Sequence, residues 1–246
     1  MALRRISVIA AALLGLGAGP LAALPSPERA LLAEMKAACG GEAWDRLQGW
    51  HERGRAELPG GQVMHYEAWH DIRTLRSVYA QRRGDVFATI SGYDGEVIWN
   101  AGAGGRVERI SDPAALRRRL RDLYVSGFAF FFPDRFPATF ALLGTRRHEG
   151  TDYDVLRITP ANADSVELWV NRQTHRIGRI VAPGETAELG NYREFDGLCT
   201  ATTGRQGDGD PAHTIVLHVE SVETGPLPNE LFFAPAPASP PSSPQP

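Results

Sequence analysis

The chain has 246 residues, of which 43% are hydrophobic and 22% are charged, and its formal net charge is −3 at pH 7. This composition is typical of a globular protein and is sufficient for one large domain. A mildly acidic chain lacks the basic surface that nucleic-acid binding requires, so we expect no nucleic-acid partner. Nearly all of the 26 basic residues are arginine. Because of this bias, a cluster of arginines is only weak evidence for a binding site.

Residues 1–23 have the pattern of a signal peptide and not of a folded segment. Arg4 and Arg5 precede an apolar stretch over 6–16, and small residues then lead to a cleavage site after residue 22 or 23. The apolar stretch is too short to span a membrane comfortably. No cysteine lies at the cleavage region, the nearest being Cys39, so we expect no lipid anchor. The sequence therefore predicts a soluble periplasmic protein, and loss of the two arginines takes its net charge from −3 to −5.

Two short helices are predicted at the start of the mature chain, over 26–47. Ser26 is a typical N-cap, and Pro27 suits the first turn of a helix. An apolar stripe that includes Leu31 and Met35 follows and ends at a pair of glycines. A shorter helix comes directly after these glycines.

From residue 48 onward the pattern changes to the two-residue period of β-strands. In the segment SVELWVNRQTHRIGRIV, Val166, Leu168 and Val170 occupy alternate positions, and the polar turn NRQTH leads to a second run. Such a hairpin has one buried face and one solvated face. Similar runs predict strands over 48–58, 63–71, 74–81, 86–91, 96–100, 106–110, 145–148, 153–158, 166–170, 176–181, 188–195, 198–203 and 213–222.

The strands are interrupted once, over residues 112–143. An aspartate followed by proline marks a helix start, and Leu116, Leu120 and Leu123 then recur at helical spacing. The opposite face of this helix carries Arg117, Arg118, Arg119 and Arg121. These arginines could contact anionic lipid or an acidic partner, but a solvated outer face is the preferred interpretation.

A phenylalanine-rich segment follows this helix. Pro133 and Pro137 exclude one continuous helix or a central strand, so we expect an irregular or short-helical segment. Its rings either fill the core, the usual location of phenylalanine, or form a movable wall around an apolar ligand. The segment holds six of the ten phenylalanines of the chain: Phe128, Phe130, Phe131, Phe132, Phe136 and Phe140.

The fold class that these elements predict is mainly β with some helix (α+β). About 11–12 strands in consecutive hairpins form an antiparallel meander, and so long a sheet curls into a strongly curved, incomplete barrel. The helices predicted over 26–47 and 112–143 would cover its concave face. We expect a single domain over 24–235 and a disordered Pro-rich tail over 236–246.

Catalytic and metal-binding signatures are lacking in the sequence. It contains no nucleophile elbow, HExxH, CxxC, phosphate-binding loop or dinucleotide glycine pattern. His65 and His70 lie five residues apart on one predicted strand and therefore point to opposite faces. We interpret the seven histidines as scattered surface residues. The sequence thus predicts a protein that is not an enzyme and has no cofactor or metal site.

The chain has two cysteines, Cys39 and Cys199. In an exported protein they can form a disulfide, which would stabilise the fold by up to about 5 kcal/mol in the chain-entropy model. The alternative is a pair of buried free thiols, and the sequence favours neither.

Four sequence motifs suggest a family. They are the helix end CGGEAW, the turn VNRQTHRIGRI, the strand NYREFDGL and the closing LPNELFFAP, which holds a Phe-x-x-Pro pattern from Phe232 to Pro235. Together they resemble the LolA/LolB-like superfamily of periplasmic lipoprotein carriers and outer membrane lipoprotein-sorting proteins, over about residues 26–235. The resemblance implies a curved half-barrel with helices over its concave face. It also implies an apolar cavity that accepts the acyl chains of a lipoprotein.

The leading hypothesis is a non-enzymatic periplasmic carrier of an acyl-bearing hydrophobic ligand, either a lipid or a lipoprotein. We expect a monomer that contacts the membrane surface only transiently. The alternatives are an envelope sensor or interaction module with a protein partner and, more remotely, a secreted hydrolase. The residues expected to bind the ligand are Phe128, Phe130, Phe131, Phe132, Phe136, Phe140, Leu116, Leu120, Leu123, Val166, Leu168 and Val170.

Overall fold

The computed structural model describes residues 26–84, 86–102 and 105–235. The signal peptide predicted for residues 1–23 and the disordered tail predicted for residues 236–246 lie outside these ranges. Within them, no helix combines the length and the apolar character needed to cross a membrane.

Thirteen antiparallel strands form one sheet, which confirms the predicted meander. Their order across the sheet is β6-β5-β4-β3-β2-β1-β13-β12-β11-β10-β9-β8-β7. The strands are β1 (Gly49–Glu57), β2 (Val63–Asp71), β3 (Ser77–Arg83), β4 (Val86–Tyr93), β5 (Ile98–Gly102), β6 (Val107–Arg109), β7 (Ala138–His148), β8 (Thr151–Pro160), β9 (Val166–Asn171), β10 (Ile177–Ala182), β11 (Glu185–Phe195), β12 (Leu198–Gly207) and β13 (Ile215–Thr224).

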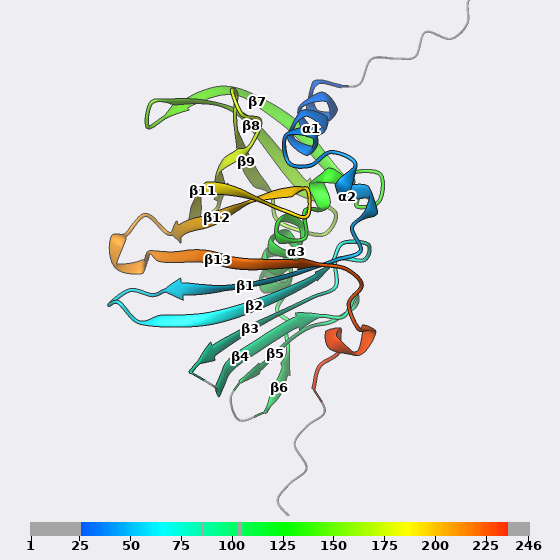
Figure 1. Ribbon diagram of the computed structural model, residues 1–246, viewed down its shortest axis with the longest axis vertical. Helices are drawn as coiled ribbons and strands as arrows, with labels where there is room; N and C mark the ends of the chain where they lie inside the picture. Colours follow the sequence, from blue (N-terminus) through cyan, green and yellow to red (C-terminus); the bar gives the residue numbers. More distant parts are fainter. Residues whose placement is uncertain (1–25, 85, 103–104, 236–246) are drawn as a thin grey trace, which may run out of the picture.

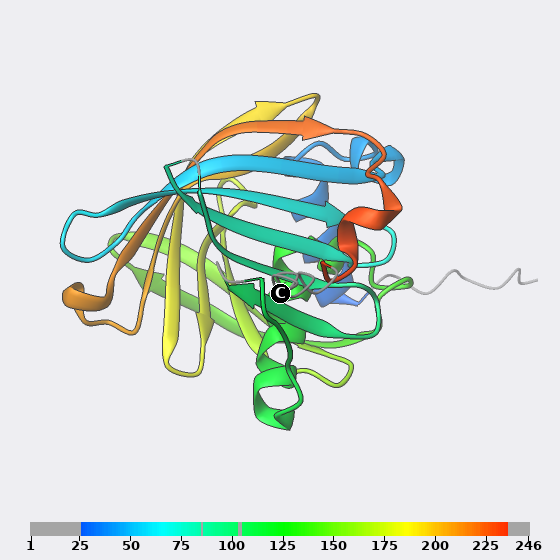
Figure 2. The same cartoon turned by 90° about the horizontal axis from the view of Figure 1, so that it is seen from below.

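The sheet is strongly curved and does not close into a barrel, as Figures 1 and 2 show. The sheet has two halves: the first consists of β1 to β6 and the second of β7 to β13. Pairing of β1 with β13 joins them. β6 and β7 follow each other in sequence but lie at opposite edges of the sheet. The chain between them must therefore cross the open side of the arch. Helix α3 (Pro113–Ser126) makes this crossing along the concave face.

Two further helices lie at one end of the sheet (Figure 1). α1 (Pro27–Ala38) begins at Ser26, whose side chain accepts a hydrogen bond from the backbone of the first turn, as predicted. α2 (Ala43–Arg46) follows it. Trp44 is buried in the core, and its indole N–H donates to the carbonyl of Cys39 at 2.8 Å. This hydrogen bond fixes α2 against the end of α1.

Arginines hold α3 against the second half of the sheet. Arg117 donates to Asp164 at 3.1 Å, and Arg121 donates to Glu185 at 3.3 Å. Arg121 is only 4% exposed. The prediction that the arginine face is solvated is therefore wrong at Arg121, because this side chain turns toward the sheet, although the other three arginines are exposed.

The phenylalanine-rich segment is only partly the irregular helical cover that the sequence predicts. η1 (Ala129–Phe131) is a short 3-10 helix, but β7 begins at Ala138. The helical cover predicted over 112–143 is therefore wrong in its last residues. β7 is an edge strand, where a preceding proline removes no hydrogen bond from the sheet. Phe140 consequently lies on the sheet and not in a lid.

A small second core lies apart from the main one and is closed by the C-terminal segment. Phe232, in η3 (Asn229–Phe232), is fully buried and packs with Val78 and Trp99. The indole N–H of Trp99 donates to the carbonyl of Phe232 at 3.1 Å. Val78 alternates along β3 with residues that face the concave side, so this cluster covers the convex side. The Phe-x-x-Pro motif therefore has a structural role here.

Candidate ligand-binding cavities

Two cavities lie on the concave side of the sheet, beside the C-terminal end of α3. Ser126, the last residue of α3, is exposed and lines both cavities. Leu123 lines the first cavity, whereas Val125 lines the second. The end of α3 therefore contributes to both linings: we call the cavity beside Leu123, which holds charged and neutral polar side chains, the polar cavity, and the one beside Val125 the apolar cavity.

The apolar cavity has a volume of about 230 Å³. Its walls come from α1, from the segment around η1 and from strands β10, β11 and β12. Most of the lining is aliphatic or aromatic, which suits a hydrophobic ligand. Its apolar residues include Met35, Phe128, Ile177, Ile180, Leu189 and Ala201.

Phenylalanine rings form one wall of the apolar cavity, and the main core supports them from behind. The ring centroids of Phe130 and Phe131 are 4.6 Å apart. Phe128 lies 4.7 Å from Trp44 and 5.4 Å from Trp50. Tilted and edge-on aromatic pairs at these separations stabilise one another beyond simple burial. The wall is therefore fixed on its core side while its other side faces the cavity.

The two cysteines meet at the boundary of the apolar cavity. Both thiols are free and buried, and the amide of Cys199 donates to the carbonyl of Cys39 at 3.0 Å. A hydrogen bond with the Cys39 thiol and the charge of Arg176 lower the pKa of Cys199 to about 7, although burial opposes this shift. The same hydrogen bond, together with burial, raises the pKa of Cys39. The structure thus brings together the two residues of the predicted disulfide, which stays a prediction.

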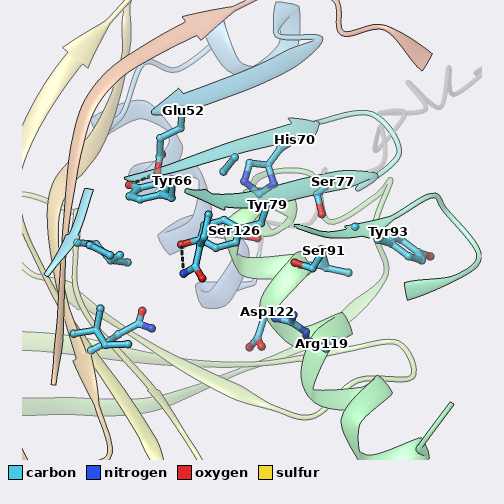
Figure 3. Close-up of a pocket in the computed structure, with 18 of the residues that line it drawn as sticks. Glu52, Tyr66, His70, Ser77, Tyr79, Ser91, Tyr93, Arg119, Asp122 and Ser126 are labelled. Carbon is cyan, nitrogen blue, oxygen red and sulfur yellow. Dashed lines mark hydrogen bonds between the residues drawn. The ribbon is translucent and has the colours of Figure 1, made fainter. Parts of the chain in front are cut away.

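The polar cavity is larger, about 390 Å³, and lies mainly under the first half of the sheet (Figure 3). Its walls come from strands β1 to β5, from β12 and β13, and from α3. The charged residues in its lining are Glu52 on the sheet and Arg119 and Asp122 on α3. Neutral polar side chains surround them: Tyr66, His70, Ser77, Tyr79, Gln81, Ser91, Tyr93, Ser126 and Gln206.

Glu52 extends from β1 into the polar cavity (Figure 3). The hydroxyl of Tyr66 donates to Oε1 of Glu52 at 2.8 Å, and the indole N–H of Trp50 donates to Oε2 at 3.3 Å. Burial raises the pKa of Glu52, and these two hydrogen bonds oppose the rise. No cationic side chain of the described residues contributes to this shift. Among the described residues Glu52 therefore has no cationic partner, although Arg119 lines the same cavity.

Tyr66 reaches Glu52 because a glycine on the neighbouring strand leaves room for its ring. Gly54 on β1 pairs with Tyr66 on β2. A Cβ atom at Gly54 would lie 2.7 Å from the tyrosine Cε1 and hydroxyl oxygen. It would also collide with the backbone carbonyl of His218 on β13. The contact between Tyr66 and Glu52 therefore depends on Gly54.

A histidine and a second tyrosine complete this wall. Burial lowers the pKa of His70 to about 4, so its ring is neutral at pH 7. The rings of Tyr66 and Tyr79 stack with centroids 5.6 Å apart, and the hydroxyl of Tyr79 accepts a hydrogen bond from Gln81 at 3.3 Å. No three His, Cys, Asp or Glu side chains in the described part of the chain are grouped as a metal site would require. The wall offers aromatic faces and neutral hydrogen-bonding groups around one carboxyl group.

The residues predicted to bind a ligand do not all lie together. Phe128, Phe130 and Phe131 line the apolar cavity, and Leu123 lines the polar one. Leu116 and Leu120 are half-buried on α3, and the other six pack in or against the core. The predicted residues that line neither cavity are Leu116, Leu120, Phe132, Phe136, Phe140, Val166, Leu168 and Val170.

The sequence analysis did not predict the polar cavity, although a signal for it exists. Glu52 shares the inward phase of β1 with Trp50, and His70 shares that of β2 with Tyr66 and Ala68. A charged residue in the buried phase of a strand is uncommon unless it is paired or functional. The interpretation of all histidines as surface residues is wrong at His70, because strand alternation turns it into the cavity.

Known structures share this architecture. No protein-family model and no curated protein matches the chain. A DUF1329 family protein from Desulfovibrio piger superposes with a TM-score of 0.60 and 17% identity, covering 85% of this chain and 98% of that chain. A LolA superfamily protein from Nitrosomonas europaea gives 0.56 and 16%, covering 84% and 97%. A domain from Vibrio parahaemolyticus, provisionally described as an outer membrane lipoprotein-sorting protein, gives 0.51 and 17%, covering 79% and 91%. The chain therefore has a LolA/LolB-like fold.

Proposed function

We propose that this protein is a non-enzymatic carrier or binder of an acyl-bearing hydrophobic ligand, a lipid or a lipoprotein, in the periplasm. The apolar cavity walled by Phe128, Phe130 and Phe131 is the observation that carries this proposal. Similar folds occur in a LolA superfamily protein and in a domain named for lipoprotein sorting, which supports the proposal.

The volume of the apolar cavity suits a segment of an acyl chain. A water molecule takes up about 30 Å³ in the liquid and a methylene group is of similar size, so 230 Å³ accommodates roughly eight methylene groups. At about 0.8 kcal/mol per buried methylene, these groups would contribute about 6 kcal/mol. Binding of this strength holds a ligand and still allows its release, as a carrier requires.

The supported aromatic wall favours a cavity that exists before the ligand arrives. Phe128 packs against the indoles of Trp44 and Trp50 on its core side, and the ring centroid of Phe131 lies 5.0 Å from that of Trp44. Rings that are already packed on one side lose little further freedom when a ligand binds on the other. Little conformational entropy is therefore lost in ordering this wall when the ligand binds.

Filling the cavity tests the proposal. Ala201 lines the apolar cavity, and a phenylalanine in its place would occupy the space of the ligand. We expect wild-type protein, stripped of lipid, to bind a fluorescent fatty acid saturably and Ala201→Phe to bind it at least about tenfold more weakly. Ala212→Phe is the matched control, because Ala212 is exposed on η2 (Pro211–His213) and lines neither cavity.

Fluorescence titration of the three proteins measures the effect, and circular dichroism checks that each is folded. Equal binding by the wild type and Ala201→Phe, or no saturable binding by the wild type, would contradict the proposal. A stable protein partner recovered with no lipid bound would instead favour an envelope sensor or interaction module.

A further inference from the structure

We propose that the polar cavity binds an amine-bearing head group of the carried ligand, with Glu52 as the counter-ion of its ammonium. This inference rests on the proposed function, because it assigns the head group of the molecule whose acyl chain occupies the apolar cavity. It divides the ligand between two cavities whose linings share Ser126.

Glu52 has unused capacity to accept hydrogen bonds. A carboxylate offers about four acceptor positions, and the two donors described for Glu52 are the hydroxyl of Tyr66 and the indole of Trp50. An ammonium group carries three N–H donors and a positive charge. It would use the remaining acceptor positions of Glu52 and offset the cost of holding this carboxylate in a partly buried site.

Aromatic faces beside Glu52 also favour a cation. Tyr66 and Tyr79 stack against each other within the lining, and the faces of tyrosine rings attract ammonium groups. His70 is neutral at pH 7 and therefore does not repel a cation. Its ring can accept a further N–H through its unprotonated nitrogen.

The remaining charges of the lining lie across the cavity on α3. Asp122 accepts hydrogen bonds from Arg121, at 2.9 Å from Nε and 2.6 Å from Nη2, so its charge is partly compensated, since Arg121 also pairs with Glu185. Arg119 is exposed on the same helix. The charged lining is therefore Glu52 on the sheet, with Arg119 and the partly compensated Asp122 opposite it on α3. A ligand whose ammonium lies at Glu52 matches this polarity.

The positions of the two cavities along α3 also suit a ligand with one polar end and one apolar end. The polar cavity is bounded by Leu123 and the apolar cavity by Val125, two residues apart on α3, with Ser126 common to both. In this proposal the ligand passes the end of α3, with its chain against Phe128 and its head near Glu52. Neither cavity alone would bind both ends of such a molecule.

A matched pair of amphiphiles tests this assignment. Dodecylamine and dodecanol have the same chain and differ in the head group, and both can be measured by displacement of a fluorescent fatty acid. We expect the wild type to prefer the amine by about tenfold or more. Glu52→Gln should abolish this preference without changing the affinity for dodecanol. The isosteric glutamine retains an oxygen that can accept the hydrogen bond of Tyr66.

Glu57→Gln is the control. Glu57 lies on the same strand as Glu52 but in the opposite phase, where it pairs with Arg55 and His218 and lines neither cavity. This variant removes one negative charge from β1 and should retain the preference for the amine. A loss of preference in both variants would show an effect of net charge and would overturn the assignment.

The failure of this inference is distinguishable from failure of the proposed function. If the wild type binds both amphiphiles with equal affinity, or if Glu52→Gln keeps the full preference for the amine, the head-group site is wrong and the acyl carrier stands. If neither amphiphile binds, both proposals are wrong.

Discussion

His70 lies on β2 in the lining of the polar cavity, where burial lowers its pKa to about 4. An ordinary histidine of an unfolded chain has a pKa near 6.5. Between these values the unfolded chain binds a proton that the folded protein does not bind. The stability that depends on neutral His70 is therefore fully present above about pH 6.5 and is lost as the pH falls toward 4.

Replacing His70 should reduce the sensitivity of the fold to acid. Glutamine does not titrate, so the His70→Gln protein should lose up to about 2–3 kcal/mol less stability than the wild type between pH 7 and pH 4.5. Urea unfolding at the two pH values measures this difference. His65→Gln, at an exposed position of the same strand, controls for the loss of a histidine. An unchanged pH dependence in His70→Gln would contradict the burial of neutral His70.

At the residue scale the sequence predicts the buried apolar positions better than the polar residues that line the polar cavity. Alternation correctly places Val166, Leu168 and Val170 on a buried face. Glu52 and His70 follow the same alternation, but their polarity suggests the surface when each residue is considered alone. Their burial depends on a neighbouring space shaped by α3, which no local pattern describes.

At the scale of elements, the hairpins are predicted well because each depends on a local turn and on a two-residue period. The run from β8 to β13 agrees with the predicted strands within a few residues at the ends. β7 is the exception, since only its last four residues are predicted as a strand: Pro137 directly precedes it, and a continuous apolar run over 140–143 masks the alternation. Its strand character comes from pairing with β8, a contact that the residues of β7 do not reveal by themselves.

Cys39 follows the last residue of α1, and Cys199 lies next to it on β12. We predict that the two thiols form a disulfide when the protein is oxidised. Oxidised glutathione should convert the two thiols to a disulfide, while the glutathione is reduced to two thiols. The Cys199 thiol would attack first, because its pKa is lowered to about 7. The bridge should raise the free energy of unfolding by up to about 5 kcal/mol.

Mass spectrometry and thiol labelling of the unfolded protein follow this reaction. The expected result is a loss of 2 Da with no reactive thiol, about the mass of two hydrogen atoms. Cys39→Ser should instead retain one glutathione as a mixed disulfide. Two thiols that stay reactive after prolonged oxidation would contradict the predicted bridge.

At the scale of the whole molecule, the open arch and the crossing of α3 create the two cavities together. The first and last strands of the order are consecutive in the chain, so their connection must lie across the concave side. The ion pairs of Arg117 and Arg121 then hold α3 against the second half of the sheet. The sequence predicts the curvature and a helix over the concave face. It does not predict that the end of this helix lies beside two cavities, one of which holds charged and neutral polar side chains.

Native mass spectrometry of protein purified from the periplasm without detergent tests the central claim most directly. The proposed function predicts an added mass corresponding to an acyl-bearing ligand, and Ala201→Phe should carry little of it because its side chain fills the apolar cavity. A wild-type protein that has only its own mass, and that acquires no lipid after incubation with phospholipid vesicles, would contradict the account.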